Sequence, residues 1–93
     1  MSYDLHGSWE KFTGHNAPLY ARVDEKDEKQ RTLNLDWALK YWLSNGVPKE
    51  KLNLGLATYG RSFRLAKQSE NGMGAPISGP GTSGTVRQFL YIY

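Results

Sequence analysis

The sequence predicts an α/β fold in which one helix connects two strands of a parallel sheet. Residues 1–5 are typical of a short strand end, residues 35–45 carry apolar side chains at helical spacing, and residues 52–59 form an apolar run. A helical crossover makes the flanking strands parallel, with a right-handed connection. Because a parallel sheet needs a layer on both faces, we expect this chain to be part of a larger domain.

Composition excludes several classes of protein. The 93 residues carry a net charge of +3, but Lys26 and Lys29 alternate with Asp24 and Asp27 instead of forming the one-sign stripe of a nucleic-acid binder. No apolar run approaches the roughly 20 residues of a membrane span. The absence of cysteine excludes disulfides and thiolate metal sites. Aromatic residues reach 13 %, which suits a sugar-holding surface as well as ordinary packing.

The first two thirds of the chain divide into a loop, a helix and a strand. Glycine, asparagine and proline punctuate residues 6–33, which predicts one long loop of the kind that often carries function. Asn34 is a suitable N-cap for the helix over 35–45, and Asn45–Gly46 supplies its stop. The apolar run 52–59 predicts a mostly buried strand.

The last third of the chain changes character after residue 60. Alternation over 61–65 predicts an extended strand, and the five glycines and two prolines within 72–84 predict turns and coil. The aromatic run 89–93 predicts a strand that stops at the last residue, which we interpret as a sign of truncation.

Two polar side chains, Tyr3 and Asp4, stand where the first predicted strand ends. Polar groups at the carboxyl ends of parallel strands usually belong to the site of such folds. The alternative is an ordinary strand exit followed by an exposed loop.

Several segments resemble family 18 glycoside hydrolases of the animal chitinase type. The matching stretches, in chain order, are MSYDLHGSWE at 1–10, TGHNAPLY at 13–20, LNLD at 33–36, GVPKEKL at 46–52, TYGRSF at 58–63, GAP at 74–76 and GPG at 79–81. Two departures stand out: Ala57 lies where many active members carry proline, and residues 85–93 are shorter than the family's corresponding motif.

The resemblance implies a partial (β/α)8 TIM barrel, about strands 6–7 with the helix between them, plus the start of an α+β insertion domain. Residues 1–60 are expected to belong to the catalytic barrel, and residues 61–93 to the truncated insertion domain. A complete barrel takes roughly 250 residues, so Met1 is expected to be an internal methionine of the motif.

The resemblance also implies hydrolysis of β-1,4-linked N-acetylglucosamine polymers with retention, the substrate's own acetamido oxygen acting as nucleophile. The family's proton donor ends a D-x-x-D-x-D-x-E motif that this chain lacks; Asp24 and Asp27 meet only its first spacing and belong to a solvated charge run. We therefore expect the parent protein to be an enzyme and the isolated chain to be inactive. Two alternatives stay open: a fragment of a non-catalytic chitin-binding lectin, and a self-contained non-enzymatic protein.

Six residues receive roles from the resemblance. Tyr3 resembles the tyrosine that donates to the acetamido oxygen, and Asp4 the aspartate that hydrogen-bonds the sugar near the cleavage point, so both are expected to support catalysis. The expected substrate-binding residues are Met1, Trp9, Tyr59 and Arg61. Trp9 offers a flat face for stacking, and the planar fork of Arg61 suits hydroxyl and acetamide acceptors.

Other features predict structural roles or no ligand. His6 and His15 have no acid at ligand spacing, which predicts loop-structuring residues and no metal site. Trp37 and Trp42 are expected to pack in the core or between helix and barrel. The resemblance implies no cofactor, chitin or N-acetylglucosamine oligomers as the partner, no nucleic acid, no membrane, a monomeric parent and secretion to the extracellular space.

Overall fold

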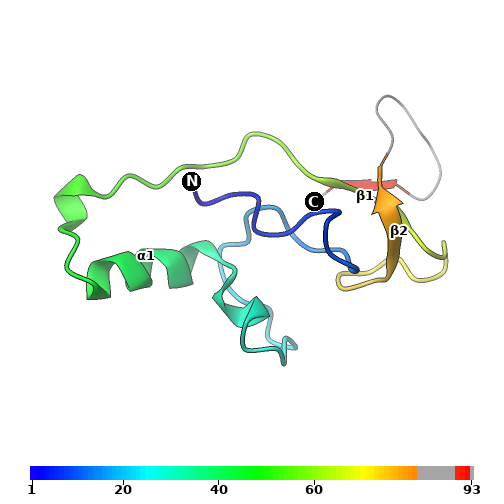
Figure 1. Cartoon of the computed structure of the whole chain (residues 1–93), viewed down its shortest axis with the longest axis horizontal. Helices are drawn as coiled ribbons and strands as arrows, with labels where there is room; N and C mark the ends of the chain where they lie inside the picture. The colour runs from blue at the N-terminus through cyan, green and yellow to red at the C-terminus, as the bar shows by residue number, and fades with distance from the viewer. Residues whose placement is uncertain (82–89, 93) are drawn as a thin grey trace. The chain divides into compact units, whose positions relative to one another are not determined.

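The structure, a computed structural model, describes residues 1–81 and 90–92 and divides into two compact units (Figure 1). The first unit combines Met1–Leu5 with Ala17–Ala57, and the second combines His6–Asn16 with Thr58–Tyr93. The division into catalytic barrel and insertion domain at residues 60 and 61 stays a prediction. No helix in the described part of the chain has the length and apolar character needed to cross a membrane.

The main element of the first unit is the helix α1, Leu35–Ser44, flanked by the 3-10 turns η1, Gln30–Thr32, and η2, Lys49–Lys51. The Asn34 side-chain oxygen accepts a hydrogen bond from the Trp37 N–H at 2.8 Å, which satisfies one of the otherwise unpaired donors of the first turn. Gly46 follows the helix with a φ of 91°, a left-handed conformation that glycine adopts without strain. The predicted helix, cap and stop are therefore confirmed.

The two strands predicted for the first unit are not formed, so these predictions were wrong. Asp4 adopts a φ of 58°, which lies outside the β region and interrupts the segment 1–5. Residues 52–57 run as an extended trace in Figure 1 but join no ladder with any described residue. A strand needs partners for its backbone groups, and without them Leu54 and Leu56 are exposed. The parallel pairing expected across α1 is accordingly absent from the described residues.

The tryptophans of α1 are not part of a core in this structure. Trp37 is 43 % exposed and Trp42 is 53 % exposed, so the first alternative, core packing, was wrong, and packing between the helix and the rest of a barrel stays a prediction. The ring of Trp37 stacks instead on Tyr41, one turn along the helix, with centroids 5.1 Å apart and planes inclined by 14°. This is the i, i+4 neighbour contact of a helix surface.

The second unit contains a three-stranded sheet of β1, Ser62–Leu65, β2, Ile77–Pro80, and β3, Leu90–Ile92, in the order β2-β1-β3. Both pairs are antiparallel, and Phe63 lies opposite Pro80 in β2 and Tyr91 in β3. Alternation along β1 buries Phe63 and Leu65 while Arg64 is exposed, so this central strand supplies the core of the unit.

The strands predicted over 61–65 and 89–93 are confirmed for the described residues; Phe89 and Tyr93 lie outside them. The prediction of turns and coil over 72–84 was wrong for Ile77–Pro80, which form β2, and residues 82–84 lie outside the described part. β2 is an edge strand of the sheet, where proline costs no ladder bond on the outer side. Because of its glycine and proline content, this strand was not predicted from the sequence.

Candidate functional site

The second unit brings together three predicted site residues, Trp9, Tyr59 and Arg61, which we call the aromatic–arginine cluster. The guanidinium carbon of Arg61 lies 5.5 Å from the centroid of the Trp9 ring and 5.7 Å from that of Tyr59. A cation over aromatic faces at this range is attracted by their quadrupoles, by about 0.5–1 kcal/mol at exposed sites. Trp9 is 60 % exposed and Tyr59 is 47 % exposed, so the cluster presents two aromatic rings to solvent beside the half-buried Arg61.

The Trp9 ring is positioned by the turn that contains it. The N–H of Glu10 donates to the carbonyl of Gly7 at 3.0 Å, which closes the turn. A Cβ placed on Gly7 would lie 2.1 Å from Cζ3 of Trp9, so the indole covers the Gly7 backbone and would have to move if residue 7 carried a side chain. The Nδ1 of His6 is hydrogen-bonded to the Glu10 carboxylate at 2.9 Å, which confirms the loop-structuring role predicted for His6.

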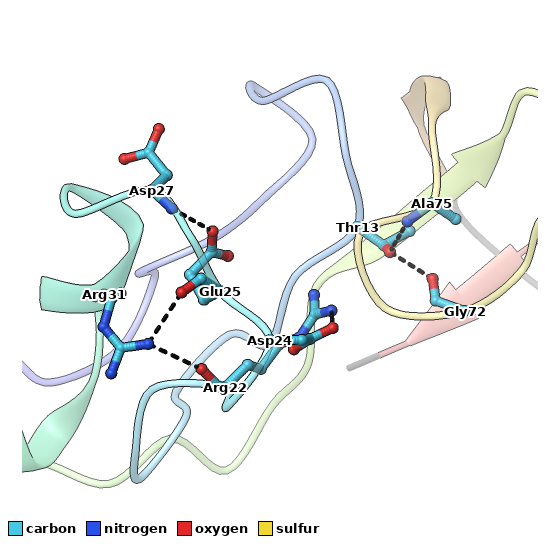
Figure 2. A network of polar contacts seen from close by, with 8 residues as sticks. All are labelled: Thr13, Arg22, Asp24, Glu25, Asp27, Arg31, Gly72 and Ala75. Carbon is cyan, nitrogen blue, oxygen red and sulfur yellow. Dashed lines mark hydrogen bonds and ion pairs between the residues drawn. The ribbon is translucent and has the colours of Figure 1, made fainter.

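Two buried polar residues, Thr13 and Asn16, anchor the loop that follows Trp9. The Thr13 hydroxyl donates to the carbonyl of Gly72 at 2.9 Å and accepts from the N–H of Ala75 at 3.1 Å (Figure 2). The Asn16 side-chain amide donates to the carbonyl of Tyr59 at 3.1 Å. Sequence reasoning did not single out either residue, although both belong to the TGHN stretch on which the family resemblance partly rests.

The remaining predicted site residues, Met1, Tyr3 and Asp4, belong to the first unit. Met1 and Asp4 are exposed, and Tyr3 is half-buried. A Cβ built on Gly55 would lie 3.2 Å from Cε1 of Tyr3 and 3.6 Å from the nitrogen of Met1, so the segment 1–5 runs beside residues 52–57. The absent side chain at Gly55 leaves room for the Tyr3 ring.

The charged loop of the first unit is organised by local bonds (Figure 2). Nε of Arg22 donates to Oδ1 of Asp24 at 3.0 Å, and this hydrogen bond lowers the pKa of Asp24 below its ordinary value. Nη1 of Arg31 donates to the carbonyl of Glu25 at 3.0 Å, and the Asp27 carboxylate accepts from the N–H of Lys29 at 2.8 Å. These exposed contacts agree with the prediction of a solvated charge run. Among the described residues, no group of three or more His, Cys, Asp or Glu could hold a metal ion.

Comparison with known proteins points to one family over nearly the whole chain. The family model described as glycosyl hydrolases family 18 matches residues 1–89. Chitotriosidase-1 of Mus musculus is 54 % identical over 84 residues, which cover 90 % of this chain and 18 % of that protein. Oviduct-specific glycoprotein of Homo sapiens is 48 % identical over 84 residues, which cover 90 % of this chain and 12 % of that protein. The chain therefore spans less than a fifth of the length of these two relatives.

Solved structures give the same picture. YKL-39, crystallised with the chitooligosaccharide GlcNAc4, superposes with a TM-score of 0.84 and 45 % identity, over 90 % of this chain and 23 % of that one. A group IV chitinase of Ostrinia furnacalis in complex with allosamidin superposes with a TM-score of 0.81 and 44 % identity, over 88 % of this chain and 22 % of that one. Human YKL-39 is described as a pseudo-chitinase with retained chitooligosaccharide binding.

Proposed function

Because this chain belongs to glycosyl hydrolases family 18, we propose that it is part of a chitinase that hydrolyses β-1,4-linked N-acetylglucosamine polymers. The reaction retains the anomeric configuration, with the substrate's acetamido oxygen as nucleophile and a glutamic acid as proton donor. That acid is supplied by a part of the parent protein outside these 93 residues, because the chain lacks the D-x-x-D-x-D-x-E motif. The similarity to a chitotriosidase over most of the chain supports this proposal.

The aromatic–arginine cluster is the observation that carries the proposal. A pyranose ring has flat C–H faces, which stack on aromatic rings, and edges rich in hydroxyl and acetamide oxygens, which accept hydrogen bonds. Trp9 and Tyr59 present two exposed rings, and Arg61 places a planar guanidinium, a group of N–H donors, over them. Stacking surface and donor groups are thus held within one small cluster, a combination that suits an N-acetylated sugar.

The first unit supplies the groups that act on the reacting sugar. The Tyr3 hydroxyl donates to the acetamido oxygen and stabilises the cyclic oxazolinium intermediate, because the hydrogen bond strengthens as charge develops. Asp4 hydrogen-bonds the sugar near the cleavage point, and Met1 lines the pocket floor. The closeness of Gly55 to both Met1 and Tyr3 supports a shared location for these residues in the parent protein.

In the parent protein, residues 1–60 belong to the (β/α)8 barrel around strands 6–7, and residues 61–93 begin the α+β insertion domain. The order of the first segment, α1 and the extended stretch 52–57 supports the former, and the antiparallel sheet of β1, β2 and β3 supports the latter. The parent is monomeric and secreted, as the family resemblance implies. The isolated chain is inactive and binds sugars weakly, because its site is not pre-organised by the rest of a barrel.

A second candidate function is a chitin-binding lectin that keeps the cluster and lacks the acid. The specific observation that favours it is the similarity to YKL-39, a pseudo-chitinase that retains chitooligosaccharide binding. Sequencing the parent upstream of Met1, through the position of the acid motif, distinguishes the chitinase from the lectin by the presence or absence of the glutamic acid.

The decisive experiment uses the full-length protein that contains this chain, incubated with the hexamer of N-acetylglucosamine. Hydrolysis that first yields the β-anomer supports the chitinase, whereas calorimetric binding without hydrolysis supports the lectin. Neither hydrolysis nor binding would contradict both candidates. Turnover of the hexamer by the purified 93-residue chain would contradict the proposed dependence on the rest of the barrel.

A further inference from the structure

We propose that Asn16 is a positioning residue of the sugar site, a role that rests on the proposed function of the aromatic–arginine cluster. Its side-chain amide donates to the carbonyl oxygen of Tyr59 at 3.1 Å, although the two residues are 43 positions apart. Asn16 itself is 3 % exposed, so its amide lies inside the unit, where water does not compete for the hydrogen bond. It fixes the backbone from which two members of the cluster project.

The peptide that joins Tyr59 to Gly60 is the part that needs to be held. Glycine has no side chain and samples more backbone conformations than any other residue, so Gly60 by itself does not define the direction of the chain between Tyr59 and Arg61. A hydrogen bond to the Tyr59 carbonyl restricts rotation of this peptide plane. Rotation would carry the guanidinium of Arg61 away from its positions 5.5 Å from the Trp9 centroid and 5.7 Å from the Tyr59 centroid.

Asn16 is a suitable fixed point because its own loop is held independently. Three residues before it, the buried Thr13 hydroxyl bonds to the backbone of both Gly72 and Ala75. The loop also forms an isolated bridge between Phe12 and Pro76. The amide of Asn16 thus transmits the position of an anchored loop to the Tyr59 carbonyl.

The test compares Asn16→Asp with a matched control in the full-length protein. Aspartate is nearly isosteric but cannot donate when ionised, so the bond to Tyr59 is lost. The control is Asn45→Asp: the Asn45 amide donates to the carbonyl of Tyr41 at 2.7 Å in an exposed position, so the control has the same charge change and loses the same type of bond. Two quantities are measured, the affinity for the N-acetylglucosamine hexamer and the chemical shift of the Arg61 Nε–H, which ring currents of Trp9 and Tyr59 displace.

We expect Asn16→Asp to weaken hexamer binding by roughly tenfold, the scale of losing one buried hydrogen bond, and to move the Arg61 resonance toward its value in unfolded chains. Asn45→Asp should change neither. A general loss of packing would not move the Arg61 resonance selectively, so this readout separates positioning from stability.

The outcomes separate this inference from the proposed function. If Trp9→Ala weakens hexamer binding while Asn16→Asp leaves both affinity and the Arg61 resonance unchanged, the positioning role is overturned and the sugar site stands. If Asn16→Asp moves the resonance but neither variant changes affinity, the sugar-binding role of the cluster is overturned. Should Asn16→Asp fail to fold, the unmodified protein gives the answer: slow exchange of the Asn16 side-chain amide protons supports the bond, and solvent-like exchange in the folded protein overturns it.

Discussion

Thr13 and Ala75 are hydrogen-bonded to each other in both directions. The backbone N–H of Thr13 donates to the carbonyl of Ala75 at 2.9 Å, and the N–H of Ala75 donates to the Thr13 hydroxyl at 3.1 Å. The same hydroxyl donates to the carbonyl of Gly72 at 2.9 Å, so it is both donor and acceptor in a buried position. This link makes residues 6–16 part of the same compact unit as the sheet.

We expect Thr13→Val to destabilise the second unit. Valine has nearly the same shape but removes both hydrogen bonds of the buried hydroxyl, and the N–H of Ala75 keeps only its longer bond to the Gly72 carbonyl at 3.2 Å. Each lost hydrogen bond costs about 0.5–1.5 kcal/mol of unfolding free energy. Native-state hydrogen exchange at the Ala75 amide of the full-length protein measures the loss. The control is Thr32→Val, which removes an exposed bond to the Lys29 carbonyl and should cost less than about 0.5 kcal/mol. Equal protection of Ala75 in Thr13→Val and in the unmodified protein would contradict the anchoring role.

The space beside Tyr3 gives a second prediction. A Cβ at residue 55 would lie 3.2 Å from the Tyr3 ring, so Gly55→Ala forces the ring to shift by a few tenths of an ångström. We expect turnover to fall by roughly threefold to tenfold, a fraction of the ~100-fold that a misplacement of about 1 Å can cost. Steady-state hydrolysis of the hexamer measures it.

The matched control for this glycine is Gly72→Ala, because nothing lies within 4 Å of the added carbon. It should leave turnover unchanged. If the two alanine variants turn over the hexamer equally fast, the Tyr3 ring is not constrained by the segment 52–57 during catalysis.

Features set by neighbouring residues could be predicted from the sequence. The helix α1, its cap at Asn34 and its stop at Gly46 all depend on contacts within one or two turns. The strand β1 was predicted because alternation alone decides which of its side chains are buried. In contrast, an apolar run such as 52–59 becomes a strand only when another strand pairs with it, and the described residues provide no such partner.

The residues of the candidate site likewise include some that the sequence predicted and some that it did not. Trp9, Tyr59 and Arg61 were found because their motifs resemble a known family, and the structure brings them together in one cluster. Thr13 and Asn16 were not found, because their partners lie 62 and 43 positions away in the sequence. A buried threonine or asparagine has no pattern of its own in a loop; only the fold reveals which carbonyl it holds.

The pKa of Asp24 provides a prediction about pH. The hydrogen bond from Arg22 lowers this pKa, so the pair stabilises the folded loop above the ordinary carboxyl range and loses this contribution as the pH falls through the lowered value. We expect Arg22→Gln to raise the Asp24 pKa toward its ordinary value in a carbon-13 titration of the carboxyl group. Arg64→Gln removes the same charge from β1 of the second unit and should not alter the titration. If the pKa of Asp24 is the same in Arg22→Gln as in the unmodified protein, the pairing is contradicted.

Removal of the Tyr3 hydroxyl tests the chemistry most directly. Tyr3→Phe keeps the ring beside Gly55 but removes the donor assigned to the acetamido oxygen. We expect turnover of the hexamer to fall by roughly 10²-fold, the scale for losing one transition-state hydrogen bond, with a much smaller change in affinity. The control Tyr41→Phe keeps the stacking of that ring on Trp37 in α1 and should be as active as the unmodified protein. Because a donor that acts only on the intermediate affects rate more than binding, a Tyr3→Phe variant with full turnover would remove Tyr3 from the mechanism.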